Sequence, residues 1–258
     1  MKKFILILLF CFIIAIPCYG QDLAMMVIGS GTVDACDDCS GTLIWASHFE
    51  GTGNSSTPFN ITTNSPCGCS DNASKLITYY SNTANSNAQS SDGSYSFYRP
   101  GTGVTDYCTS PLTSTSTTIF SVQFDIYLVT GATGSTIFQI RYDVSNRIYV
   151  VINTDDFAVN WVGNGTTKSL DTASGTDWDM TSNTWHTIRM QGRVGTSPYI
   201  RATLDGGSVK TYTTADNTAM TNAPSIFYMG HVGTGVPEFY IDKVYIWEDW
   251  QTGTNWGD

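Results

Sequence analysis

Apolar and polar side chains alternate along the chain from residue 119 onward. The clearest run sets apolar residues at every second position, with polar or amphipathic residues between them; the apolar ones are Phe120, Val122, Phe124, Ile126 and Leu128. A period of two residues is typical of a β-strand with one buried face and one wetter face. The run therefore predicts a long strand that covers a hydrophobic core.

Further runs of this kind predict a strand-rich domain. They span 43–49, 76–80, 95–98, 138–143, 148–152, 157–161, 185–191, 199–204, 209–213, 226–231 and 239–247. Segments rich in Gly, Ser, Thr and Asn separate them, and Asp205-Gly206 is a strong hairpin signal. Apart from a short helical turn within 215–223, we expect no helix.

Strands of this number and spacing predict an all-β fold. Tight turns favour antiparallel order, so the expected architecture is a β-sandwich of two packed sheets. The first and last strands are expected to be neighbours in one sheet. Side chains such as Phe124, Ile140 and Leu204 should then meet between the two sheets.

The N-terminus resembles a secretory signal. Lys2 and Lys3 precede an unbroken apolar run over 4–16, and Pro17 and Gly20 follow it. This order of charged, apolar and small residues is typical of an export signal, and the run is too short for a membrane-spanning helix. We expect cleavage after Gly20, whereas a lipid anchor on Cys18 is the rival interpretation. The predicted location is secreted, either extracellular or periplasmic.

The rest of the chain divides accordingly. We expect a signal peptide at 1–20, an extension at 21–40, the β-sandwich at 41–252 and a short tail at 253–258. No later stretch is long and apolar enough to span a membrane.

Charged residues make up only 13% of the chain, and the net charge is −10. Nucleic-acid binding is not expected, because phosphates call for Lys and Arg.

The cysteines concentrate toward the N-terminal part of the chain. Two of the seven fall in the expected signal, and the others are Cys36, Cys39, Cys67, Cys69 and Cys108. In an oxidising compartment these five are candidates for disulfides, with one thiol left over. A zinc site on the two close pairs is the less favoured alternative.

The segment from Asn183 to Ile188, followed by 199–206, resembles paired strands of laminin-G-like domains. Phe239 to Ile246 resembles the closing strand of the wider concanavalin A-like superfamily, and Phe49-Glu50-Gly51 resembles its opening strand. The resemblance covers roughly residues 42 to 250 and implies a concanavalin A-like jelly roll. It implies no single function, because this fold hosts lectins, enzymes and adhesion domains.

The resemblance also implies a structural calcium ion. In many relatives such an ion joins the opening strand to an Asp of the closing strand. The matching ligands here are Glu50, backbone oxygens near Gly51 and Gly53, and Asp242. Calcium takes several hard oxygen ligands, which an acidic chain supplies.

The sequence argues against one class of enzyme on this fold. Glycoside hydrolases need two carboxylates that flank the bond. The chain has Glu only at positions 50, 238 and 248, and these do not form the paired-Glu strand of that class. A lyase is harder to exclude, because Gln139-Ile140-Arg141 resembles the Gln-Ile-His strand of jelly-roll alginate lyases, although the other lyase motifs are missing.

Polar residues on the wetter faces of several strands could line a groove for sugars if those strands are neighbours. Rings stack on sugar C–H faces, while amide, carboxylate and guanidinium groups bond to hydroxyls. The candidates are Gln123, Asp125, Tyr127, Gln139, Arg141, Arg189, Gln191, Tyr199 and Arg201. The leading hypothesis is a non-catalytic carbohydrate-binding or adhesion module. A divergent lyase or hydrolase, and a self-associating subunit of a surface or filament assembly, are the alternatives.

Overall fold

The fold is described from a computed structural model of the chain. The described residues are 43–49, 51–54, 57–61, 77–79, 83–91, 93–101, 105–112, 119–131, 134–153, 156–163, 165–169, 178, 180–195, 199–207, 209–213, 222–233 and 235–249. The expected signal and extension, the tail, Glu50 and all cysteines except Cys108 lie outside them. All the described residues belong to one compact unit, residues 35–258.

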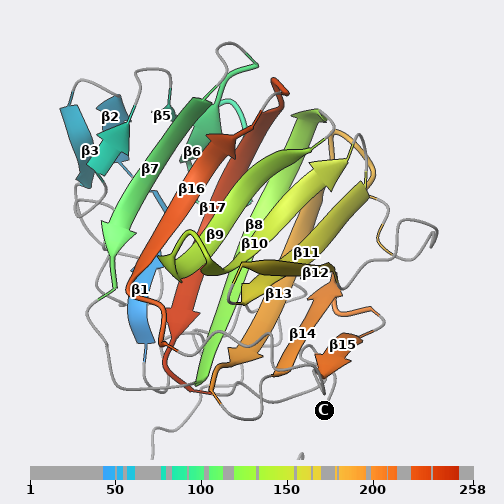
Figure 1. The fold of residues 1–258 in the computed structure, drawn as a ribbon. Coiled ribbons are helices and arrows are strands. Elements are labelled where there is room, and N and C mark those ends of the chain that lie inside the picture. The colour runs from blue at the N-terminus through green and yellow to red at the C-terminus, as the bar shows by residue number, and fades with distance from the viewer. Residues whose placement is uncertain are drawn as a thin grey trace, which may run out of the picture. The chain divides into compact units, whose positions relative to one another are not determined.

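The described residues form strands in two antiparallel sheets, which confirms the predicted all-β sandwich (Figure 1). Within them, no helix is long and apolar enough to cross a membrane. The larger sheet has the strand order β15-β14-β13-β8-β17-β6-β5-β2-β3, and β1 also pairs with β17. The bounds of these strands are β15 Lys210–Thr213, β14 Tyr199–Leu204, β13 Trp185–Arg193, β8 Ile119–Thr130, β17 Glu238–Trp247, β6 Ser96–Arg99, β5 Ala84–Ser86, β2 Gly51–Asn54, β3 Thr57–Ile61 and β1 Leu43–Ser47.

The smaller sheet has the strand order β12-β11-β10-β9-β16-β7-β4. Its strands are β12 Thr166–Ser169, β11 Asp156–Gly163, β10 Asn146–Asn153, β9 Ser135–Asp143, β16 Ile226–Val232, β7 Thr105–Pro111 and β4 Ile77–Tyr79. The expected pairing of the first and last strands is confirmed, because β1 runs antiparallel to β17. The expected hairpin is confirmed as well: Leu204 accepts a hydrogen bond from Gly207, and Asp205 and Gly206 between them both have positive φ.

One hydrophobic core fills the space between the sheets. Phe124, Ile140 and Leu204 belong to it, as the alternation predicts. Phe124 of the larger sheet stacks on Phe138 of the smaller one, with ring centroids 4.9 Å apart. Burial of such apolar surface is the main favourable contribution to folding.

Cys108, one of the five disulfide candidates, lies in this core. The thiol is free and fully buried, and its Sγ lies 3.4 Å from Oγ1 of Thr83. Burial raises the pKa of Cys108 to about 12. The side chain behaves as a small apolar residue between the sheets, whereas the pairing of the other cysteines stays a prediction.

Candidate functional site

Four aromatic side chains form one row across the outer face of the larger sheet. Backbone pairing sets Tyr98 of β6 opposite Tyr240 of β17. It sets Tyr240 opposite Tyr127 of β8, and Tyr127 opposite Trp185 of β13. The rings of Tyr98 and Tyr240 stack with centroids 4.6 Å apart, and the ring of Tyr127 lies 6.0 Å from Tyr240 and 5.5 Å from Trp185. We call these four residues the aromatic row.

The aromatic row is partly open to solvent. Tyr98, Tyr127 and Trp185 are half-buried, and Tyr240 is buried. The hydroxyl of Tyr98 donates to Oε1 of Glu238 at 2.9 Å. Burial, together with the neighbouring Glu238, raises the pKa of Tyr98 to about 12, and burial also raises the pKa of Tyr240. Both phenols are therefore neutral at physiological pH, and the row offers apolar ring faces with hydroxyl edges.

Sequence reasoning found only one member of the aromatic row, Tyr127. Trp185 and Tyr240 occupy outward positions in alternating strands, which was a usable signal. Their meeting depends on the neighbour order β6-β17-β8-β13, which joins segments far apart in the chain. Periodicity gives the face on which a residue lies but does not give the order of strands.

The next row of the same face carries two buried carboxylates. Asp242 of β17 pairs with Asp125 of β8, which is one of the predicted ligand-binding residues. Oγ of Ser91 lies 2.8 Å from Asp125 and 3.2 Å from Asp242, and the backbone N–H of Ser91 donates to Asp242 at 2.9 Å. Burial raises the pKa of Asp125. The segment that carries Ser91 thus lies against both carboxylates and bonds to them.

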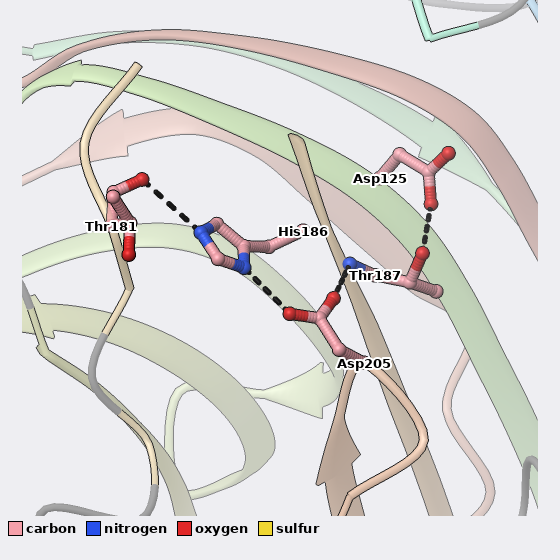
Figure 2. A network of polar contacts seen from close by, with 5 residues as sticks. All are labelled: Asp125, Thr181, His186, Thr187 and Asp205. Carbon is pink, nitrogen blue, oxygen red and sulfur yellow. Dashed lines mark hydrogen bonds and ion pairs between the residues drawn. The ribbon is translucent and has the colours of Figure 1, made fainter. Parts of the chain in front are cut away.

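A polar network continues from Asp125 to the start of β13, as Figure 2 shows. Thr187 donates from Oγ1 to Asp125 and from its backbone N–H to Oδ1 of Asp205, both at 2.7 Å. Oδ2 of Asp205 lies 2.6 Å from Nδ1 of His186, whose Nε2 lies 3.1 Å from the carbonyl oxygen of Thr181. Both partners of the imidazole are acceptors, so in its protonated form the ring donates from both nitrogens.

The protonation of His186 has a consequence for catalysis. Its hydrogen bond to Asp205 raises the pKa of His186. A general base needs a nitrogen lone pair within reach of substrate. Both ring nitrogens of His186 are engaged by protein acceptors, so this residue acts as a structural tie between β13 and the turn after β14.

Most of the other predicted ligand-binding residues on the larger sheet bond to one another. Nε of Arg189 donates to Oε1 of Gln123 at 2.7 Å. Nε of Arg201 donates to Oε1 of Gln191, whose Nε2 donates to Oγ of Ser121 at 3.0 Å. Gln123, Gln191 and Arg201 are buried. For these three residues the expectation of a wetter face is wrong, because their amide and guanidinium groups are paired inside the protein.

The predicted ligand-binding residues do not share one groove. Gln139 and Arg141 belong to β9 of the smaller sheet, on the opposite side of the core from the others. Tyr199 lies at the start of β14, half-buried, with its hydroxyl 3.5 Å from Oγ1 of Thr211. The structure thus divides the candidates between two faces, and binding itself stays a prediction for each.

The geometry does not test the calcium prediction. Among its ligands, Glu50 lies outside the described residues, and Gly53 lies in β2. Asp242 already accepts hydrogen bonds from Ser90 and Ser91 at Oδ2 and from its neighbour Lys243 at Oδ1. In the described part of the chain, no group of three His, Cys, Asp or Glu residues could hold a metal ion. Asp242 would thus need oxygens from elsewhere to bind calcium.

Comparisons with known proteins show the fold and no family. No protein-family model matches the chain, and no curated protein matches it. Solved structures do match. One is the binding domain of botulinum neurotoxin DC in complex with SialylT, at 11% identity and a TM-score of 0.55 over 83% of this chain and 50% of that chain. The chain therefore spans about half the length of that domain.

Two other similar structures are matched over most of their length. The cellulose-induced protein Cip1 has 14% identity and a TM-score of 0.51, over 66% of this chain and 88% of that chain. Domain 4 of AbnA, an extracellular arabinanase of Geobacillus stearothermophilus in complex with arabinotriose, has 16% identity and a TM-score of 0.50, over 69% of this chain and 80% of that chain. Identities this low are evidence for a shared β-sandwich alone.

Proposed function

We propose that the protein is an exported, non-catalytic carbohydrate-binding module of the concanavalin A-like type. The observation that carries the proposal is the aromatic row, in which four rings meet in register across four neighbouring strands. Aromatic faces bind the C–H faces of sugars, and hydroxyl edges exchange hydrogen bonds with sugar hydroxyls.

The size of the aromatic row favours a chain of sugars over a single one. Neighbouring strands lie about 4.8 Å apart, so four strands give a platform of roughly 14 Å. Glu238 lies at one end of it, beside Tyr98, and supplies carboxylate oxygen to accept sugar hydroxyls. A linear oligosaccharide laid across the strands would contact several rings at once.

Structural neighbours support this class of ligand. Two similar structures are complexes, domain 4 of AbnA with arabinotriose and the binding domain of botulinum neurotoxin DC with SialylT. Catalysis has less support, because His186 is fully engaged and because Asp125 and Asp242 are covered by Ser91. We further propose structural calcium at Asp242 and self-association as properties of the exported protein.

Pull-down on insoluble polysaccharides, with a glycan array beside it, tests the proposal. The wild type should bind at least one neutral polysaccharide. Trp185→Ala should weaken this binding about fivefold or more, since aromatic contacts contribute about 1 kcal/mol each. Tyr142→Ala is the matched control, because Tyr142 is an exposed aromatic of the smaller sheet. No binding to any glycan, or equal losses in both variants, would refute the aromatic row as the site.

A further inference from the structure

The outer face of the smaller sheet sets two arginines side by side. Arg141 of β9 pairs directly with Arg147 of β10, and both are half-buried. Like charges directly opposite each other on a sheet are destabilising. We call these two residues the arginine pair, and their closeness needs an explanation in a chain whose net charge is −10.

Asp143, at the end of β9, is a carboxylate whose charge acts on Arg141 and tends to raise its pKa. Its Oδ1 also accepts hydrogen bonds from Ser145 and Asn146 in the β9–β10 turn. Burial and the neighbouring charge of Arg147 outweigh this effect and lower the pKa of Arg141 overall. The pair therefore presents two concentrated positive charges.

Tyrosine rings hold both guanidinium groups in place. Cζ of Arg141 lies 3.9 Å from the ring centroid of Tyr228, and Cζ of Arg147 lies 4.8 Å from that of Tyr149. Arg141 also donates from Nη2 to the hydroxyl of Tyr228. Tyr107 packs against Tyr228 at 5.2 Å. Guanidinium groups stacked in this way are preorganised to bind a planar or tetrahedral oxyanion.

A buried amide lies beside the arginine pair. Gln139 pairs in register with Tyr149 on one side and Tyr228 on the other, and it is only 2% exposed. Its Oε1 accepts no hydrogen bond from the described residues, and Nε of Arg147 likewise donates none to them. Buried polar groups left in this state cost about 1–3 kcal/mol each. Both atoms lie beneath the solvent-accessible surface, so they form a polar layer under the arginine pair.

We infer that this face binds the acidic group, a carboxylate or a sulfate, of a polysaccharide. Arg141 and Arg147 contact the oxyanion, and the tyrosine rings pack on the sugar. The site lies on the opposite sheet from the aromatic row and takes a different class of sugar. It does not depend on the proposed function.

Affinity electrophoresis with acidic polymers tests this inference. A polyuronate, a sulfated polysaccharide and a neutral polysaccharide are each cast into native gels. The wild type should be retarded by at least one acidic polymer, and added salt should reduce the retardation. Arg141→Ala and Arg147→Gln should each weaken binding about tenfold or more, as expected for a charge-assisted hydrogen bond. Arg193→Ala, which removes an exposed positive charge of the larger sheet, should leave it unchanged.

Other outcomes overturn the inference. They are no retardation by either acidic polymer, unchanged retardation in both variants of the arginine pair, or an equal loss in Arg193→Ala. Gln139→Leu is a second probe, because it removes the amide under the arginine pair without a charge change and should weaken binding while far-ultraviolet circular dichroism stays native. If Trp185→Ala abolishes acidic binding and Arg147→Gln retains it, acidic sugars bind the aromatic row instead. That result would leave the proposed function intact.

Discussion

Nδ1 of His186 lies 2.6 Å from Oδ2 of Asp205, and the pair ties β13 to the turn that follows β14. Asp205 is half-exposed, with a side-chain exposure of 49%, so the pair is worth at most about 1 kcal/mol. It has a distinct pH dependence, because the pKa of His186 is raised whereas the pKa of Asp205 is lowered.

The His186–Asp205 pair predicts a window of added stability. Because the pKa of His186 is raised in the folded protein, its contribution to stability is complete below about pH 6.5, the unfolded pKa. This contribution is lost as pH rises through the folded pKa. Although burial would raise the pKa of Asp205, hydrogen bonds from His186 and Thr187 lower it. The contribution of Asp205 to stability is present at pH values above its unfolded pKa and is lost as pH falls through its folded pKa. Thermal melts of wild type and Asp205→Asn should differ most near pH 5–6.

The control for this pair is Asp143→Asn, because Asp143 is an exposed carboxylate that accepts hydrogen bonds from its own turn on the other sheet. A difference between wild type and Asp205→Asn that stayed constant from pH 4 to pH 9 would contradict an imidazolium at His186.

A close contact at Gly192 tests the packing of the two sheets. A Cβ atom there would lie 2.4 Å from Cζ of Phe120 and 3.1 Å from Cδ1 of Ile148, which belongs to the other sheet. Gly192→Ala should therefore lower the free energy of unfolding by about 1–3 kcal/mol. Denaturant melts check the effect. Gly195→Ser is a control for substitution without a packing clash, because nothing lies within 4 Å of a Cβ at Gly195 and only its positive φ would be strained. An unchanged Gly192→Ala midpoint would be inconsistent with this packing.

Buried Cys108 predicts an unreactive thiol. A pKa of about 12 leaves almost no thiolate at neutral pH, and the side chain is fully buried. Native protein should show no labelling of Cys108 by a thiol reagent within minutes, whereas protein unfolded in guanidinium should label fully. Peptide mass spectrometry distinguishes this thiol from the other cysteines. Rapid labelling of Cys108 in native protein would contradict its place between the sheets.

Calcium removal tests the metal proposal at Asp242. If calcium binds there, millimolar calcium should raise the melting temperature of the wild type relative to a chelator, and Asp242→Asn should abolish the difference. Equal melting temperatures with and without calcium would exclude a stabilising ion. In that case, the hydrogen bonds from Ser90 and Ser91 would stabilise the Asp242 carboxylate without a metal ion.

The alternation of residues predicted the fold better than it predicted the site. Phe124, Ile140 and Leu204 meet in the core because a period of two assigns a face to each strand position. Short strands without alternation, such as β5 and β12, gave no comparable signal. Nor did the pattern reveal β7, whose Thr105–Pro111 stretch is mostly polar and ends in proline.

The site was harder to predict because an outward position does not show whether a polar side chain is exposed to solvent or is buried and bonded within the protein. Gln191 and Arg201 lie on outward positions, as expected, but they are buried and bonded to each other. Gln139 and Arg141 lie on the other sheet, since β9 pairs with β10 and β16 and not with β8. In the β17 strand, an irregularity between Asp242 and Tyr245 shifts the pairing with β8, which a strict period of two would not include.

The most direct test of the central claim is the dissociation constant of one neutral oligosaccharide for wild type, Tyr98→Ala, Trp185→Ala and Tyr142→Ala, measured by titration calorimetry. The account predicts that the two variants at the ends of the aromatic row each bind about fivefold more weakly or worse, while Tyr142→Ala binds like wild type. Equal affinities in all four proteins would contradict it, because the sugar would then lie elsewhere on the molecule.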